Sequence, residues 1–184
     1  MVNKGAPILL IYFVIAAIVI IIDQLSKWLV REYMTLDESI SVLGDQFFQL
    51  TSHRNRGAAF GILQDQRWFF ITITIVVIVG IIIFLYRTIR SGKRLLPIAL
   101  SLILGGASGN FIDRLLAGEV TDFFHFTFIF DLLGKHVNYE FAIFNVADCA
   151  IVVGGILFVL DTLLAWRQES KENRQQEARR SENE

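Results

Sequence analysis

The sequence has few of the residues that form disulfides and metal sites. Its 184 residues include one cysteine, Cys149, so an internal disulfide is impossible and a cysteine metal cluster is excluded. The three histidines, His53, His125 and His136, do not show a metal-binding spacing such as His-Glu-x-x-His. A zinc peptidase is therefore not expected, and we predict no metal and no cofactor. The formal net charge is −1, which gives no sign of a nucleic-acid partner.

Charged residues are also scarce, whereas long hydrophobic runs are prominent. Hydrophobic residues make up 54% of the chain and the mean hydropathy is +0.53, which is too apolar for an ordinary soluble domain. The length suits a single domain, and we predict one membrane domain over residues 1–184. Apolar runs long enough to cross the ~30 Å hydrocarbon core predict transmembrane helices. The expected helices cover residues 7–33, 68–86, 95–115 and 141–166.

Basic residues predict how these helices cross the membrane. They gather near the N-terminus, in the short loop 87–94 and in the charged tail 167–184, and they are sparse in segments 34–67 and 116–140. The positive-inside rule therefore places both termini in the cytoplasm and the two longer segments outside.

The two outer segments differ in composition. Residues 41–51, SVLGDQFFQLT, mix β-branched and aromatic residues with turn formers, which predicts short strands. Residues 116–140 contain many phenylalanines, which is typical of a segment in the membrane interface, and we predict a loop there.

Polar residues gather at the outer ends of three predicted helices. These residues are Asp23 and Lys27 on the first helix, Asn110, Asp113 and Arg114 on the third, and Asn145 and Asp148 on the fourth. Ionisable residues in a membrane helix indicate a functional site by default. The alternative is a set of helix caps and interhelical hydrogen bonds. Scattered caps need not share one depth, so the agreement in depth favours a site.

Two carboxylates at this depth fit amide hydrolysis. Two adjacent aspartates cannot both ionise and therefore share a proton, so one can activate a water while the other protonates the carbonyl oxygen. Asp122, just past the third helix, and Asp148, one turn into the fourth, are the natural pair. Asp113 competes, but its position at a helix end beside Arg114 favours pairing or capping.

A serine mechanism is the weaker interpretation. Residues 106–109 read GASG, which resembles the serine motif of rhomboid peptidases. Serine there needs a histidine base, and none of the four predicted helices contains histidine. We interpret Ser108 as a small residue for close helix packing.

Five short motifs in order carry a family resemblance. DQLSK, NRGAAFG, GNFIDR, VTDF and FNVAD together resemble the lipoprotein signal peptidases, also called signal peptidase II. The resemblance implies an all-α integral membrane protein with four transmembrane helices, a small extracytoplasmic β-cradle at about 41–61, and an extracytoplasmic loop or lid between helices three and four. It implies an intramembrane aspartic endopeptidase of the bacterial inner membrane. Such an enzyme removes signal peptides from prolipoproteins by cutting before a diacylglyceryl-modified cysteine. The implied partners are lipid-modified prolipoproteins and membrane lipid, and we expect a monomer.

The resemblance also assigns residues. It implies that Asp122 of VTDF and Asp148 of FNVAD are catalytic. The supporting or substrate-binding positions that it implies are Asp23, Lys27, Asn55, Gly106, Asn110, Arg114 and Asn145.

Helical spacing suggests roles for several of these residues. Asn145 precedes Asp148 by three residues and is expected on the same helix face, where it can orient the dyad. Asp23 and Lys27 are four residues apart and are expected to form an ion pair. Arg114 either binds substrate carbonyls or pairs with Asp113.

Two further expectations concern the cavity walls. Asn55 and Gly57 suit a tight turn over the site, where the Asn55 side chain can hold the substrate chain. Phe60, Phe123 and Phe144 either line a groove for acyl chains or face lipid and core.

Two other functions compete with the peptidase. A proton-coupled transporter would place polar groups near the bilayer midplane and would show inverted repeats, and the sequence has neither feature. A non-catalytic scaffold would bind lipoproteins without cleaving them.

Overall fold

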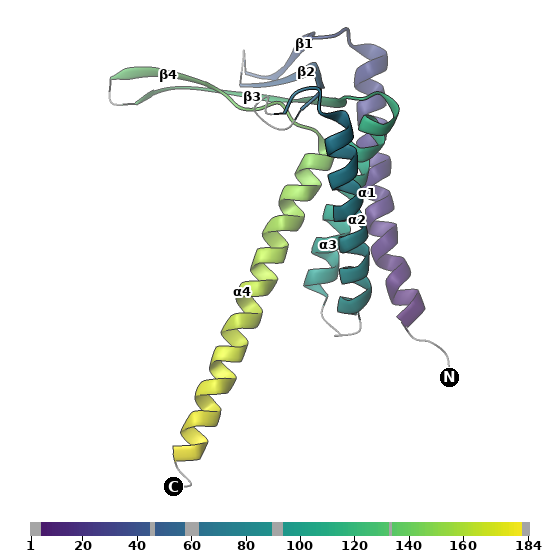
Figure 1. The fold of residues 1–184 in the computed structure, drawn as a ribbon. Helices are drawn as coiled ribbons and strands as arrows, with labels where there is room; N and C mark the ends of the chain where they lie inside the picture. Colours follow the sequence, from purple (N-terminus) through teal and green to yellow (C-terminus); the bar gives the residue numbers. More distant parts are fainter. Residues whose placement is uncertain (1–4, 45–46, 58–62, 90–93, 133, 182–184) are drawn as a thin grey trace.

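The computed structural model describes residues 5–44, 47–57, 63–89, 94–132 and 134–181. Four helices and four strands alternate in small groups along this part of the chain (Figure 1). Their order is α1 (Gly5–Tyr33), β1 (Ser39–Leu43), β2 (Phe48–Asn55), α2 (Arg67–Ile89), α3 (Leu95–Leu116), β3 (Val120–Leu132), β4 (Lys135–Glu140) and α4 (Val146–Ser181).

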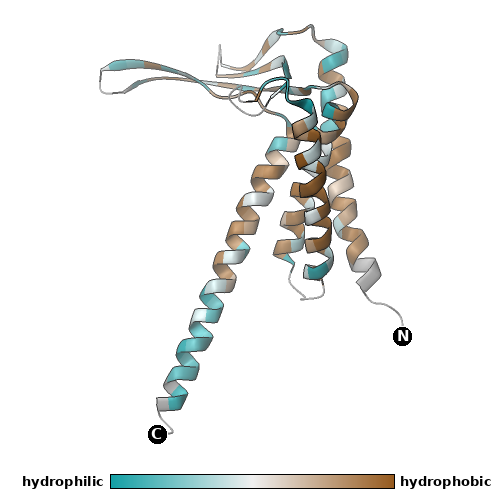
Figure 2. Ribbon diagram, in the orientation of Figure 1, coloured by the Kyte–Doolittle hydropathy of each residue, from teal (hydrophilic) through white to brown (hydrophobic). Residues whose placement is uncertain are grey.

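All four helices are long and apolar enough to cross a membrane. Figure 2 shows mostly hydrophobic residues along the helices, hydrophobic and hydrophilic residues mixed in the sheet, and hydrophilic residues over the C-terminal part of α4. The predicted helices therefore exist, with small differences in their bounds. The fourth differs most, because it begins at Val146 rather than at residue 141 and continues as helix to Ser181.

Helix α3 is the centre of the helical part, because it packs against α1, α2 and α4. Glycines permit the close approach. A Cβ added to Gly105 would lie 2.7 Å from Val19 Cβ of α1, and one added to Gly106 would collide with the backbone of Ala147 in α4. A Cβ added to Gly154 of α4 would lie 2.7 Å from the backbone oxygen of Ala99 in α3. Small residues let membrane helices pack backbone to backbone, as expected for this glycine-rich part of α3.

The four strands form one antiparallel sheet in the order β1-β2-β3-β4 across one end of the helices (Figure 1). Strands β1 and β2 confirm the strands predicted near residues 41–51. The β2–β3 register places Asn55 opposite Val120, with an irregularity between Leu50 and His53. This register brings the end of β2 beside Asp122 of β3.

The segment between α3 and α4 is mostly a β-hairpin rather than the predicted loop. Its strands pair from Thr127 with Glu140 to Leu132 with Lys135. Phenylalanines at every second position from 124 to 130 have the period of a strand with one apolar face, which explains the hairpin. The protein therefore combines four helices with a four-stranded sheet, so the label all-α was incomplete.

Candidate active site

A cavity of about 270 Å³ lies where the sheet meets the ends of α3 and α4. It contains both members of the predicted dyad, because Asp122 of β3 and Asp148 of α4 both line it. The other lining residues are Asn55, Gly57, Asn110, Arg114, Val120, Phe141, Ala142, Ile143 and Phe144. Polar and catalytic candidates from three separate parts of the sequence therefore meet at one hollow.

Asp122 is held by two amide side chains. Asn145 donates from Nδ2 to Oδ1 over 2.6 Å, and Asn55 donates from Nδ2 to Oδ2 over 3.0 Å. Asn55 also closes a turn, since its Oδ1 accepts the Gly57 N–H over 2.9 Å. The predicted turn is present, and in this structure the Asn55 side chain binds a cavity carboxylate.

Asp148 is held in a similar way. Asn110 donates from Nδ2 to Oδ1 over 2.8 Å, and the Asn145 backbone N–H donates to Oδ2 over 3.2 Å. The Asp148 N–H donates in return to Asn145 Oδ1 over 3.0 Å. Asn145 precedes the first residue of α4, so it caps the helix. The expectation that Asn145 and Asp148 share a helix face is therefore wrong.

Burial changes the acidity of Asp122, which is only 2% exposed. Removal from water, and next the negative charge of Asp148, raise the pKa of Asp122 from 3.8 to about 6. The hydrogen bonds from Asn55 and Asn145 and the charge of Lys27 act in the opposite direction. A carboxyl in this environment holds a proton to much higher pH than an aspartate in water.

A buried cation lies beneath the cavity. Lys27 Nζ is 2.8 Å from Asp23 Oδ2 and 3.0 Å from Asp113 Oδ2, and all three side chains are buried. It also donates to Asn110 Oδ1 over 2.8 Å, which links this cluster to Asp148. Asp23 in turn accepts the Ala147 N–H over 2.9 Å. The expected Asp23–Lys27 ion pair is therefore present, and it joins α1 to both α3 and α4.

The side chains of the neighbouring residues Asp113 and Arg114 contact different groups. Asp113 belongs to the Lys27 cluster and also accepts hydrogen bonds from Gln24 Nε2 and the Thr121 N–H. Arg114 lines the cavity, where its Nη2 donates to Gly57 O over 2.9 Å. Its guanidinium lies 4.6 Å from the centre of the Phe70 ring. The two expected alternatives for Arg114 were binding of substrate carbonyls and pairing with Asp113. The geometry favours the first, because Arg114 faces the cavity.

The remaining predicted positions have other surroundings. Gly106 serves the α3–α4 contact and does not line this cavity. Phe144 lines the cavity, whereas Phe123 is buried in the core at 3% exposure. Phe60 lies outside the described residues.

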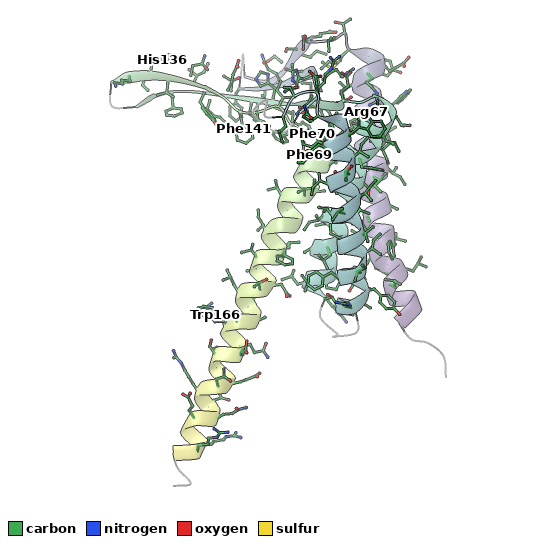
Figure 3. The ribbon with its side chains drawn as sticks, viewed as in Figure 1. Arg67, Phe69, Phe70, His136, Phe141 and Trp166 are labelled. Carbon is green, nitrogen blue, oxygen red and sulfur yellow. The ribbon has the colours of Figure 1, made fainter. Side chains whose placement is uncertain are left out.

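Sequence reasoning missed Gln24, Phe70 and Arg67. Arg67 begins α2, and its guanidinium donates to the carbonyl oxygens of Arg114 over 2.9 Å and Leu115 over 2.7 Å. It thereby satisfies backbone acceptors at the end of α3, where a helix lacks its own donors. Figure 3 shows Arg67 and Phe70 on the first turns of α2, at the end of the helices that carries the sheet. Gln24 is adjacent to Asp23 in sequence, but nothing local indicates the partners of Arg67.

Comparison with known proteins decides the family. The family model described as Signal peptidase (SPase) II matches residues 15–164. The chain belongs to the signal peptidase II family. It is 50% identical over 163 residues to a lipoprotein signal peptidase of Brevibacillus brevis, covering 89% of this chain and 99% of that one. It is 47% identical over 163 residues to the lipoprotein signal peptidase of Bacillus subtilis, with the same two coverages.

Two solved structures have a similar fold. A bacterial membrane enzyme solved by the in meso method at 2.3 Å superposes with a TM-score of 0.70 and 38% identity. That match covers 83% of this chain and 87% of the other. A second, described in the same words at 1.9 Å, gives a TM-score of 0.68 at 37% identity, covering 83% and 92%. The chain is therefore a peptidase and a multi-pass membrane protein.

Proposed function

We propose that this signal peptidase II family member is an aspartic endopeptidase whose catalytic dyad is Asp122 and Asp148. The observation that carries the proposal is that both carboxyl groups open on one cavity, with a hydrogen-bond donor on each of their four oxygens. The substrates are diacylglyceryl-modified prolipoproteins, and cleavage takes place before the modified cysteine. The names of the curated relatives support this substrate class.

The dyad shares one proton in the resting enzyme. The ionised carboxylate takes a proton from a water, whose oxygen attacks the scissile carbonyl carbon. The protonated carboxyl donates its proton to the carbonyl oxygen, which gives a neutral tetrahedral diol. One diol O–H returns a proton to the dyad as the carbon–nitrogen bond breaks, and the leaving nitrogen takes a proton from the other carboxyl. The products are the carboxyl end of the signal peptide and a free amine on the cysteine.

The cavity supplies groups that orient the substrate chain. Arg114 places a fixed positive charge beside the two carboxyls, where its N–H groups can bind substrate carbonyls. The turn at Asn55 and Gly57 closes the cavity on the sheet side. Phe141 and Phe144 form an apolar wall beside the carboxyls. Binding of the lipid and the signal helix at a distance from the scissile bond aligns that bond with the dyad.

The location follows from the charge distribution of the chain. We place the protein in the bacterial cytoplasmic membrane with both termini inside, because basic residues lie around residue 4, in 87–94 and beyond 167. The sheet and the cavity then lie at the outer face, where lipid-modified precursors meet the enzyme. We expect a monomer as the working unit, because both carboxyl groups of the proposed dyad come from one chain.

The test uses the purified full chain in nanodiscs with a diacylglyceryl-modified precursor. We expect release of the signal peptide, and little or no release from the same precursor without the lipid. Asp122→Asn and Asp148→Asn should each lower turnover by about 100- to 10,000-fold or more, because each removes a proton-transfer group. Asp131→Asn is the matched control, since that carboxyl is 77% exposed on the hairpin.

Two outcomes would reject the dyad. Full activity in either cavity variant would show that its carboxyl is not needed for turnover. Precursor binding without cleavage, unchanged when both aspartates are replaced, would favour a lipoprotein-binding scaffold. Melting curves for each variant separate a loss of chemistry from a loss of fold.

A further inference from the structure

The outer part of the β3–β4 hairpin, residues 126–132 and 134–140, extends sideways from the helices at the level of their ends (Figure 1). Figure 3 shows His136 at its far end and Phe141 where the hairpin returns to the start of α4. Large apolar side chains remain exposed along it: Phe128 is 39%, Phe130 46% and Tyr139 47% accessible. Such a row on one element marks a binding surface rather than a core.

The hairpin has two unlike faces. Phe128 lies opposite Tyr139, and Phe130 lies opposite Val137, so these four side chains share one face. The intervening pairs occupy the other face, which is polar apart from Ile129. Those pairs are Thr127 with Glu140, Ile129 with Asn138, and Asp131 with His136. Asp131 and His136 also contact each other at 2.9 Å on that polar face. The hairpin is therefore amphipathic with the period of a strand.

The strand itself shows which way the aromatic face points. Phe126, Phe128 and Phe130 follow one another at every second position and therefore lie on one face of β3. Asp122 is not in this series, because the N–H groups of Phe123 and Phe124 both donate to Phe144 O and interrupt the alternation there. Phe126 stacks on Phe144, which lines the cavity at the ends of α3 and α4. The aromatic face therefore points to the side of the sheet on which the helices lie.

We propose that the aromatic face of the β3–β4 hairpin rests on the lipid surface of the bilayer leaflet next to the sheet. The helices cross the bilayer, so a hairpin that extends sideways from their ends lies along its surface (Figure 1). Aromatic side chains favour the headgroup region, where an apolar ring and a polar edge both find partners. The polar face, with Asp131 and His136, then faces water. Lipid contact holds the far end of the strand that carries Asp122 at a fixed height above the bilayer.

Spin labels on the two faces test this proposal in the full chain, reconstituted in nanodiscs. Cysteine is introduced at Phe130 or at its neighbour Asp131 in a Cys149→Ala background, and accessibility to oxygen and to a water-soluble nickel chelate is measured. Val79→Cys on the exposed side of α2 calibrates lipid, and Glu172→Cys on the exposed end of α4 calibrates water. A second pair, Val137→Cys and His136→Cys, repeats the measurement on β4. This pair on β4 still tests the proposal if a β3 variant fails to fold.

We expect labels at residues 130 and 137 to resemble the lipid calibrator, with high oxygen and low nickel accessibility. Labels at residues 131 and 136 should show the reverse order. Equal nickel accessibility on both faces would place the hairpin in water and overturn the proposal. Exclusion of both reagents from residues 130 and 137 would also overturn it, because it would mean that protein covers the face. Broadening between labels would then identify a second copy of the chain.

Discussion

Asn145 and Asp148 hold each other through the first turn of α4. The Asp148 N–H donates to Asn145 Oδ1 over 3.0 Å, and the Asn145 N–H donates to Asp148 Oδ2 over 3.2 Å. This reciprocal arrangement is a capping box, in which the residue before a helix and its third residue satisfy each other's backbone donors. Asn145 uses its remaining amide group for Asp122. One side chain therefore both starts the helix and joins the two carboxyls of the proposed dyad.

Two substitutions at Asn145 should separate these tasks. Serine keeps an oxygen that caps the helix but has no amide donor for Asp122, whereas alanine has neither. We expect Asn145→Ala to lose about 0.5–2 kcal/mol more stability than Asn145→Ser, because it also loses the cap. Both should lower kcat/KM by about 10- to 100-fold, since each removes a hydrogen bond to a charged group worth about 1.5–3 kcal/mol. Thermal melts and precursor cleavage measure the two effects, and full activity in Asn145→Ser would contradict the second role.

Asn55→Ala should raise the pKa of Asp122 above about 6, because the lost hydrogen bond stabilises the ionised form. If the dyad needs one proton, the alkaline limb of the kcat/KM profile should move to higher pH. The folded protein binds this proton more tightly than the unfolded chain, so its contribution to stability falls as pH rises from 3.8 to about 6. In the Asn55→Ala variant, this fall in stability should continue to higher pH. Gln49→Ala, on the same strand, is the control. An unmoved alkaline limb would show that Asp122 does not set it.

Gly106→Ala should disturb the site from outside the cavity. Its Cβ would collide with the Ala147 backbone and lie 2.8 Å from Ile151 Cγ1, which forces α3 and α4 apart. Those helices carry Asn110 and Asp148, so activity should fall together with stability, by about 1–3 kcal/mol for overpacking. Gly155→Ala is the matched control, since its Cβ meets nothing within 4 Å and alanine is the better helix former. We expect Gly155→Ala to remain as stable and active as the parent, and equal effects of the two changes would refute this packing role.

Lys27→Met should be the most destabilising of these changes. It leaves Asp23 buried without a cation and leaves Asp113 with only the more distant Arg31, and breaking a buried ion pair in this way costs about 3–5 kcal/mol. Adding Asp113→Asn should recover part of the loss, because one uncompensated carboxylate disappears. Arg31→Met is the control, since Arg31 is 35% exposed and lies 3.7 Å from Asp113. Denaturation in mild detergent measures the order, and a Lys27→Met protein as stable as Arg31→Met would contradict it.

The helices were predictable because apolar length alone specifies a membrane span. The sheet was predictable only in part. Near residues 41–51 the strand formers are interrupted by turn residues, and the prediction of strands there was correct. Between residues 120 and 140 the abundance of phenylalanine was interpreted as an interfacial loop. The alternation within FFHFTFIF has the period of a strand, and that signal was overlooked.

Most of the polar residues that line the cavity could be named from the sequence, but not what each one contacts. Helical spacing was enough for the Asp23–Lys27 pair. Helical spacing gave a wrong prediction for Asn145. That prediction took residue 145 to be part of the helix, whereas α4 begins at Val146. Asp113 pairs with Lys27, and Arg67 binds carbonyl oxygens of α3. The members of each of these contacts lie far apart in the chain. No local pattern encodes such partners, since they depend on how the helices pack.

The buried charges also imply an order of assembly during biosynthesis. Asp23 and Lys27 lie one turn apart on α1, so they neutralise each other as soon as that helix forms. Asp113 belongs to α3, which leaves the ribosome much later, and it meets its cation only when α3 packs against α1. Until that moment the newly made α3 carries an unpaired acid at the membrane boundary. Docking of α3 onto α1 therefore gives Asp113 its buried cation.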